Sequence, residues 1–381
     1  MSGPERCRLR DLGVGVGVGV LATGPLNAIT DVPGVRVGHC TVSWGGPELP
    51  RGSGPARTGV TAVFPHGDDI WHHRVAAGAF AANGVGEVIG ISAIREWGLI
   101  ETPVLLTNSQ SAGAVYDATV RWMMDHDQRI GIDDAVMPVV GECDDGFLND
   151  LRGMHVKAEH VREALDGALA GPVAEGCVGA GTGMTCFDFK AGIGTSSRVI
   201  SAHGHPFTVG VLALSNFGVR HRLMIDGVPV GREITDLMPV ENREGSCIVV
   251  LATDAPLSAR QCERLAKRCS LGLAVTGSYA SDGSGEIMVA FTTAHRVPRE
   301  SAEPLQFTSV ANDQMHGLFE AAVDATAESV VNSLCAAHTT VGRDAQVAHA
   351  LPLERLVTAL RMYGREASLP NGQAPSCRAS R

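Results

Sequence analysis

The chain has 381 residues, of which 44% are hydrophobic and 46 are glycine, and this length suffices for a large domain with a buried core. Its 31 Lys and Arg against 41 Asp and Glu give a formal net charge of −10. These values exclude a nucleic acid as the main partner, because phosphate binding needs a basic stripe and the positive charge here is scattered.

The N-terminal segment, residues 1–26, contains the repeat GVGVGVGV at positions 13–20. Such a repeat predicts an irregular arm, although its strict alternation could also indicate an edge strand. The segment has no hydrophobic core typical of a signal peptide, and the chain has no uncharged apolar run that predicts a membrane span. Ten cysteines without a C-x-x-C pair are typical of reduced thiols, so we expect a cytoplasmic protein with no membrane partner.

Apolar runs rich in valine and isoleucine, bounded by glycine, proline or aspartate, predict β-strands. The expected strands cover residues 59–64, 87–94, 103–107, 136–140, 208–214, 246–252 and 286–293. Apolar residues at helical spacing predict helices over 111–125 and 313–337. A third helix is expected to begin at Ser258, where Ser258 and Gln261 match a capping box.

The alternation of strands and helices indicates the fold class. Strands that are apolar throughout imply burial on both faces, which requires helical layers outside the sheets and favours an α/β layered sandwich. No linker divides the central part, so residues 27–363 are expected to form a single domain. The polar segment 364–381, rich in proline and glycine, is expected to be a disordered tail.

Two patterns that could bind a cofactor or a metal are weak. The stretch VGAGTGM, residues 178–184, lacks the third glycine of a dinucleotide fingerprint, and no helical pattern follows it. The loop PHGDDIWHH at 65–73 and the pair HGH at 203–205 contain candidate zinc ligands, but they are equally typical of plain polar loops. We therefore expect no cofactor and no metal.

Gly245 and Ser246 lie where the charged segment ENREG, residues 241–245, meets the apolar run CIVVL. A serine at this place is commonly an ordinary strand start. It could instead be a nucleophile that becomes a new N-terminus when the Gly245–Ser246 bond breaks. The freed α-amine, with an ordinary pKa of about 7.7–8.0, could then act as its base. A glycine before the serine would help the hydroxyl to reach the preceding carbonyl.

A second polar segment, GSYASDGSGEIMVAF at 277–291, brings Ser284 and Glu286 to the start of another apolar strand. Alternation along an extended chain places both side chains on one side. If this strand pairs with the one that begins at Ser246, a hydroxyl and a carboxylate would flank the nucleophile and could relay a proton. A capped turn with a surface glutamate is the alternative.

Two further strands end at polar side chains. Asn216 follows the predicted strand 208–214, and its amide could donate to an oxyanion, although an asparagine in a turn beside glycine is common. Glu142, Asp144 and Asp145 follow another strand. One buried carboxylate there would select substrates with a free ammonium group, whereas a solvated acidic loop would not.

Several segments, in consistent order between about residues 8 and 363, carry a resemblance to a known family. They are NAITDVPGVRVGH (27–39), TGVTAVFP (58–65), NGVGEVIG (83–90), ETPVLLTNS (101–109) and REGSCIVVLATDAPL (243–257). Together they resemble the DmpA-like aminopeptidases of peptidase family S58. This family contains L-aminopeptidase/D-amidase/D-esterases and β-aminopeptidases, which are self-cleaving serine hydrolases.

The resemblance implies a fold, an assembly and a processing step. The expected fold is a four-layered αββα sandwich similar to that of N-terminal-nucleophile hydrolases, and the expected assembly is a homotetramer. Cleavage of the Gly245–Ser246 bond would give an α chain, residues 1–245, and a β chain, residues 246–381.

The resemblance also implies roles for individual residues. The matched positions are Ser246 as nucleophile, Ser284 and Glu286 as its supporting residues, Asn216 as oxyanion donor, and Glu142 as the acid that contacts the free amine of the substrate. Asp144 is a departure, because some relatives carry a tyrosine there. An additional carboxylate at this place should favour cationic ligands or raise the pKa of a neighbouring carboxyl group.

We therefore predict an autoprocessed serine aminopeptidase or amidase. Its expected substrates are short peptides, amino-acid amides or esters with a free amine, in L-, D- or β-form. An acyltransferase of similar self-cleaving design is one alternative, and a non-catalytic binding scaffold is the other. The hydrolase predicts two fragments on a denaturing gel, whereas a scaffold would remain one chain.

Overall fold

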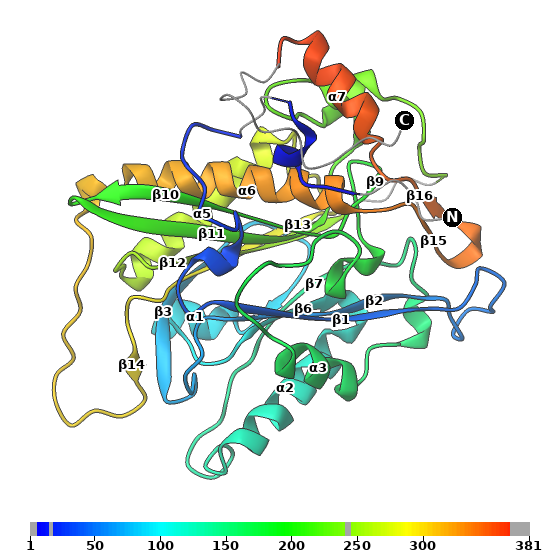
Figure 1. Cartoon of the computed structure of the whole chain (residues 1–381). Coiled ribbons are helices and arrows are strands. Elements are labelled where there is room, and N and C mark those ends of the chain that lie inside the picture. The colour runs from blue at the N-terminus through cyan, green and yellow to red at the C-terminus, as the bar shows by residue number, and fades with distance from the viewer. Residues whose placement is uncertain (1–5, 15–17, 241–244, 366–381) are drawn as a thin grey trace.

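The computed structural model describes residues 6–14, 18–240 and 245–365. Two β-sheets lie face to face, and helices cover the outer face of each sheet (Figure 1). From one side to the other, the layers are α6, the larger sheet, the smaller sheet, and the pair α2 and α3. The predicted four-layered αββα sandwich in one domain is therefore confirmed.

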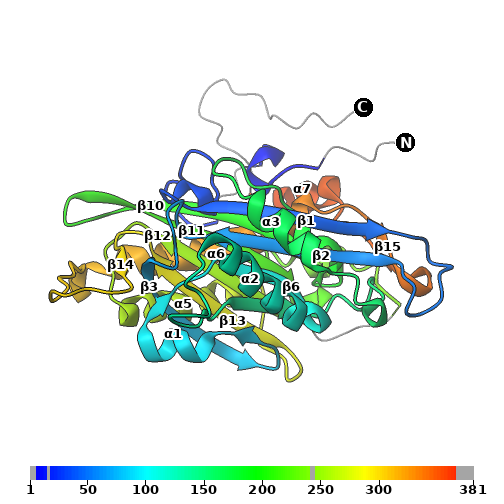
Figure 2. The same cartoon turned by 90° about the horizontal axis from the view of Figure 1, so that it is seen from below.

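The smaller sheet has the strand order β1-β2-β6-β7-β4. Its strands are β1 (Arg36–Trp44), β2 (Ala56–Phe64), β6 (Val104–Asn108), β7 (Val139–Cys143) and β4 (Val88–Ile89). Of these neighbours only β6 and β7 run parallel, so both end at the same edge of the sheet. The helices α2 (Ala112–His126) and α3 (Ala158–Asp166) pack on its outer face, as Figure 2 shows from below.

The larger sheet has the order β10-β11-β12-β13-β3-β14, and β5 also pairs with β3. Its strands are β10 (Ile193–Ala202), β11 (His205–Asn216), β12 (Ser246–Thr253), β13 (Gly285–Thr292), β3 (His73–Gly84), β14 (Val297–Pro298) and β5 (Leu99–Ile100). The central strands β12 and β13 are parallel, and β11 is antiparallel to β12. The helices α5 (Ala259–Val275) and α6 (His316–Ala336) cover the outer face.

The remaining elements are short. They are the helices α1 (Ile91–Trp97), α4 (Val230–Glu233) and α7 (Leu353–Met362), the hairpin strands β8 (Thr185–Cys186) and β9 (Phe189–Lys190), the pair β15 (Thr340–Val341) and β16 (Val347–Ala348), and the 3-10 turns at Leu9–Leu12, Ile29–Asp31, Ser109–Ser111, Leu151–Gly153, Gly179–Gly183, Arg220–Arg222, Asn312–Gln314 and Arg343–Ala345. Within the described ranges, no helix combines the length and hydropathy needed to cross a membrane.

Most predicted elements are present. The strands at β2, β6, β11, β12 and β13 and the helices α2, α5 and α6 match the sequence patterns, and Ser258 caps α5 together with Gln261. The strand expected at 136–140 begins three residues later, as β7. The strand expected at 87–94 is wrong beyond Ile89, because Gly90 adopts φ 93° and the following residues form α1.

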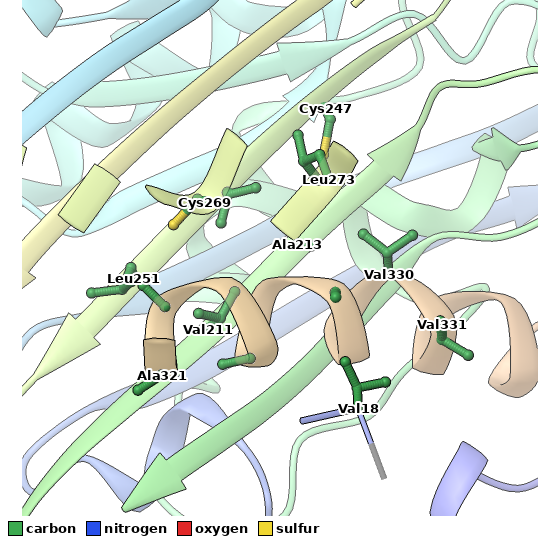
Figure 3. Packing of buried hydrophobic residues seen from close by; sticks show 14 of the residues in the cluster. Val18, Val211, Ala213, Cys247, Leu251, Cys269, Leu273, Ala321, Val330 and Val331 are labelled. Carbon is green, nitrogen blue, oxygen red and sulfur yellow. The ribbon is translucent and has the colours of Figure 1, made fainter. Parts of the chain in front are cut away.

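Alternation along β12 decides which way its first side chains point. Ile248 and Val250 pack between the two sheets, whereas Cys247 and Val249 pack on the side of α5 and α6. Figure 3 shows Cys247 beside Leu273 in this outer layer. Cys247 is therefore a core thiol, and it faces away from the space between the sheets.

The described part of the N-terminal segment is irregular apart from one 3-10 turn, and it forms no strand. It nevertheless contributes Leu9, Val14 and Val18 to the core beside α6. Residues 15–17 of the repeat lie outside the described residues, as does most of the predicted tail 364–381.

Candidate active site

Ser246 is the first residue of β12, in the middle of the larger sheet. It pairs with Asn216, the last residue of β11, and with Gly285, the first residue of β13. Its exposed fraction is 5%. The strands that begin near residues 246 and 286 do pair, which meets the condition set in the sequence analysis. Three chain segments with candidate polar groups therefore meet at one end of these strands.

Ser284 and Glu286 flank Gly285, the register partner of Ser246. The Ser284 hydroxyl donates to Glu286 Oε1 at 2.5 Å, and both side chains are buried. Burial raises the pKa of Glu286, while contacts with Ser284 and Asn83 oppose that rise. The two side chains therefore form a buried hydroxyl–carboxylate pair on the strand next to Ser246, an arrangement that suits proton transfer.

Asn216 lies across the strand pair from Ser246, and its side-chain amide is fixed at both ends. Oδ1 accepts the backbone N–H of Thr185 at 3.0 Å, and Nδ2 donates to the Asp144 carbonyl at 2.9 Å. An amide nitrogen carries two hydrogens, and among the described residues only one of those of Nδ2 has an acceptor, so the other can serve a further acceptor. This arrangement suits a donor to an oxyanion beside Ser246.

Glu142 lies near the end of β7, in the sheet that faces Ser246. Its Oε1 accepts the backbone N–H of Glu87 at 2.8 Å, and its Oε2 accepts the Ser109 hydroxyl. Burial raises the pKa of Glu142, which these two hydrogen bonds oppose and the nearby Asp144 reinforces. A buried carboxylate with two donors already in place can hold the ammonium group of a ligand.

Asp144 is exposed and follows β7 directly. It lines a cavity of about 30 Å³ together with Asn216, Gly245, Asp188 and other residues. That volume is sufficient to hold water. Five of the predicted site residues thus lie at the strand ends around Ser246, while residues 241–244 of the predicted cleavage segment lie outside the described residues.

Comparison with known proteins identifies the family. Residues 27–348 match the model of peptidase family S58. The chain belongs to this family. A β-peptidyl aminopeptidase of Sphingosinicella microcystinivorans is 42% identical to it, over 96% of this chain and 94% of that protein.

Solved structures agree with this assignment. A β-aminopeptidase from Burkholderia sp. has a TM-score of 0.88 and 42% identity, covering 95% of this chain and 100% of that one. The L-aminopeptidase D-Ala-esterase/amidase from Ochrobactrum anthropi has a TM-score of 0.89 and 43% identity, covering 94% and 99%. The latter is described as a prototype for the serine aminopeptidases and a variant of the Ntn hydrolase fold. The resemblance stated from the sequence is confirmed, and this S58 peptidase is a hydrolase.

The sequence patterns missed several side chains and backbone groups around the site of this S58 peptidase. Ser109 binds Glu142 because β6 and β7 are parallel neighbours, so residues that follow both strands meet at one edge. The buried thiol of Cys143 contacts the Ser246 side chain from the opposite sheet. Thr185 contributes only a backbone N–H, which no residue-type pattern can reveal.

The histidine-rich loop does not join this site. His66 Nε2 hydrogen-bonds to the His73 carbonyl at 2.7 Å. Asp69, His72 and Asp127 do offer ligand atoms within 4.8 Å of one another. However, Arg129 lies 3.1 Å from Asp127 and also contacts His72. The Arg129 guanidinium thus already pairs with one of the two carboxylates, which disfavours a metal ion there.

Proposed function

We propose that this chain is a self-cleaving serine aminopeptidase or amidase with Ser246 as its nucleophile. The observation that carries the proposal is the position of Ser246, which pairs with Asn216 on one side and with the strand of Ser284 and Glu286 on the other. The substrates are short peptides, amino-acid amides or esters with a free amine.

Processing comes first. The Ser246 hydroxyl attacks the carbonyl of Gly245, the peptide nitrogen of Ser246 leaves as the free amine, and water hydrolyses the resulting ester. Gly245 and Pro239 line the small cavity beside Asn216. Release of the new C-terminus at Gly245 would therefore enlarge this cavity and admit a substrate.

Turnover then repeats the same chemistry on a substrate. Ser246 Oγ attacks the scissile carbonyl, and its proton passes to the freed α-amine or through Ser284 to Glu286. Asn216 Nδ2 donates to the oxyanion. The leaving amine or alcohol takes up a proton, and water hydrolyses the acyl-enzyme to regenerate Ser246.

Glu142 anchors the free amine of the substrate. Its carboxylate is buried at the end of β7 and is oriented by Ser109 and by the Glu87 N–H. Three relatives or neighbours are named as β-peptidyl or β-amino aminopeptidases, and another as an L-aminopeptidase with D-Ala-esterase and amidase activity. These names support amine-bearing L-, D- and β-aminoacyl substrates.

The decisive experiment compares the intact masses of the wild type and Ser246→Ala. The wild type should give fragments of 245 and 136 residues, roughly 26 and 14 kDa of the 39.8 kDa chain, the smaller one beginning at Ser246. Ser246→Ala should remain whole and inactive. A wild-type enzyme that turns over while its chain is unbroken would refute the mechanism.

An acyltransferase remains the second candidate, because an acyl-enzyme beside an amine-binding carboxylate can also pass its acyl group to an amine. Product analysis with and without an added amino-acid amide distinguishes the two. Hydrolysis predicts free acid as the main product at low amine concentration, whereas a transferase predicts coupled product.

The assembly and the location complete the proposal. Four copies of the 39.8 kDa chain, about 159 kDa together, would form a homotetramer, as family members typically do, and light scattering measures this mass. The eight cysteines between residues 40 and 335 are free thiols, which suits a reducing cytoplasm. Fractionation of the producing cells would test that location.

A further inference from the structure

Lys190 is a buried cation in the β8–β9 hairpin, which hydrogen-bonds to Asn216 of the candidate active site. It ends the β8–β9 hairpin, and its exposed fraction is 0%. Its ammonium donates to three backbone carbonyls, those of Gly181 at 3.2 Å, Met184 at 2.9 Å and Ala191 at 2.6 Å. An ammonium has three hydrogens, so these bonds use its full donor capacity. Burying such a charge costs several kcal/mol unless it is well compensated.

Two buried groups balance this charge. Burial lowers the pKa of Lys190, and the nearby Cys177 and Asp145 oppose that change. Burial alone would raise the pKa of the Cys177 thiol, but Lys190 and His338 lower it to about 6. The three carbonyl acceptors match the ammonium form of Lys190, which is the form that can donate to all three.

The carbonyls held by Lys190 belong to the loop that orients Asn216. Met184 is followed by Thr185, and the Thr185 N–H donates to Asn216 Oδ1 at 3.0 Å. In the same hairpin, the Phe187 N–H donates to the Phe217 carbonyl at 2.8 Å. The hairpin therefore hydrogen-bonds to the side chain of Asn216 and to the backbone of the next residue, Phe217. Since Oδ1 accepts the bond from Thr185, Nδ2 must be the atom presented to the site.

We propose that Lys190 is a positioning residue for the oxyanion donor: by fixing the carbonyls of Gly181 and Met184 it fixes the Thr185 N–H, and through it the amide of Asn216. This inference rests on the proposed function, in which Asn216 donates to the oxyanion. Lys190 itself touches neither substrate nor nucleophile. Its loss should allow Asn216 to rotate, while the amine anchor at Glu142 stays in place.

The first test replaces Lys190 by methionine, which is similar in length but has no donor. We expect kcat to fall about 10- to 100-fold with KM nearly unchanged, because a misplaced oxyanion donor weakens only the transition state. Lys190→Gln keeps two N–H donors and should recover part of the loss. Arg198→Met is the matched control, because Arg198 is also a fully buried cation but pairs with Glu328. It should lower the melting temperature without a comparable change in kcat.

A double-mutant cycle tests whether Lys190 acts through Asn216. In an Asn216→Ala background, Lys190→Met should cost little further activity, because the group that it positions is already absent. Full additivity of the two losses would overturn the inference and leave the proposed function intact. Asn216→Ala with unchanged kcat, by contrast, would contradict the proposed role of Asn216 itself.

A measurement on the wild type covers the case in which the Lys190 variants do not fold. Hydrogen exchange should show the Thr185 amide protected to the same degree as amides of β12. Rapid exchange at Thr185 would show that the link between the hairpin and Asn216 is absent, and the inference would fail.

Discussion

Asn216 and Ser246 are direct partners in the antiparallel pairing of β11 and β12. Their relative position is therefore set by the backbone of the larger sheet and not by contacts between their side chains. Both strands are buried in their central parts, so substitutions of these two side chains should leave the sheet in place. Loss of activity in such variants can thus be attributed to chemistry.

Asn216→Ala removes the proposed oxyanion donor. We expect kcat to fall about 10²- to 10³-fold, with a smaller change in KM, because the bond to Nδ2 strengthens only in the transition state. Processing should slow as well, since the same donor would stabilise attack on Gly245. Steady-state kinetics and the fraction of unprocessed chain measure the two effects. Asn312→Ala, at an exposed position of the 3-10 turn Asn312–Gln314, is the control, and equal losses in both variants would contradict the assignment.

Glu142, as the proposed amine anchor, should give the enzyme an acidic limb in its pH profile. An ordinary glutamate has a pKa of about 4.3. Because burial raises the pKa of Glu142 above its ordinary value, this carboxyl group becomes protonated at a higher pH. The protonated form cannot hold an ammonium, so kcat/KM should fall as the pH drops through this raised pKa. Glu142→Gln should abolish that limb and raise KM about 10- to 100-fold for substrates with a free amine. A limb that persists unchanged in Glu142→Gln belongs to another group.

Two neighbours should move this limb in opposite directions. The Ser109 hydroxyl donates to the Glu142 carboxylate and lowers its pKa, so Ser109→Ala should shift the limb to higher pH. Asp144 raises the pKa of Glu142 by charge repulsion, so Asp144→Asn should shift the limb to lower pH. Profiles of kcat/KM against pH for the two variants measure the direction of each shift. Shifts in the same direction would rule out Glu142 as the titrating group.

Gly245→Ala should block processing. A Cβ atom at Gly245 would lie 1.7 Å from the carbonyl oxygen of Asn216, a distance that no real contact allows. The junction must then move away from the oxyanion donor, and the unprocessed chain should accumulate on a denaturing gel. Gly113→Ala in α2 is the control, since nothing lies within 4 Å of its added Cβ. Wild-type processing rates in Gly245→Ala would show that the junction is not held in this way.

The sequence predicted the strands of this site better than the contacts within it. The apolar runs that become β12 and β13 were visible because both strands are buried on two faces, and the polar residues at their starts were therefore conspicuous. Their pairing could only be conjectured, because register depends on segments distant in sequence. The prediction of a strand over 87–94 was wrong beyond Ile89, because Gly90 adopts a left-handed conformation that the apolar composition does not indicate.

Contacts made with main-chain atoms could not be predicted from patterns of residue type. Thr185 binds Asn216 through its main-chain N–H, and Lys190 binds main-chain carbonyls of Gly181 and Met184, whose residue types indicate no such role. The tertiary fold brings residues 185 and 216 together across a separation that no local period describes. Such contacts can be found only once the sheet and the hairpin are both in place.

Glu328 should hold the two fragments together after processing. It is fully buried in α6, and its carboxylate accepts hydrogen bonds from Arg10 at 2.7 Å and from Arg198 at 2.6 Å. Both arginines belong to the proposed α chain, whereas Glu328 belongs to the β chain. Removal of one member of such a buried set is costly, because it leaves the remaining charges uncompensated.

Glu328→Gln leaves two guanidinium groups without their buried counter-charge, which should destabilise the protein by about 3–5 kcal/mol. We expect the processed enzyme to separate into its fragments at lower urea concentration, as measured by size-exclusion chromatography. In the uncleaved Ser246→Ala background the same substitution should lower the unfolding midpoint, yet the chain stays covalently whole and can refold. Glu320→Gln, at an exposed position of α6, is the control. Equal urea resistance of the Glu328 and Glu320 variants would show that this ion cluster does not join the fragments.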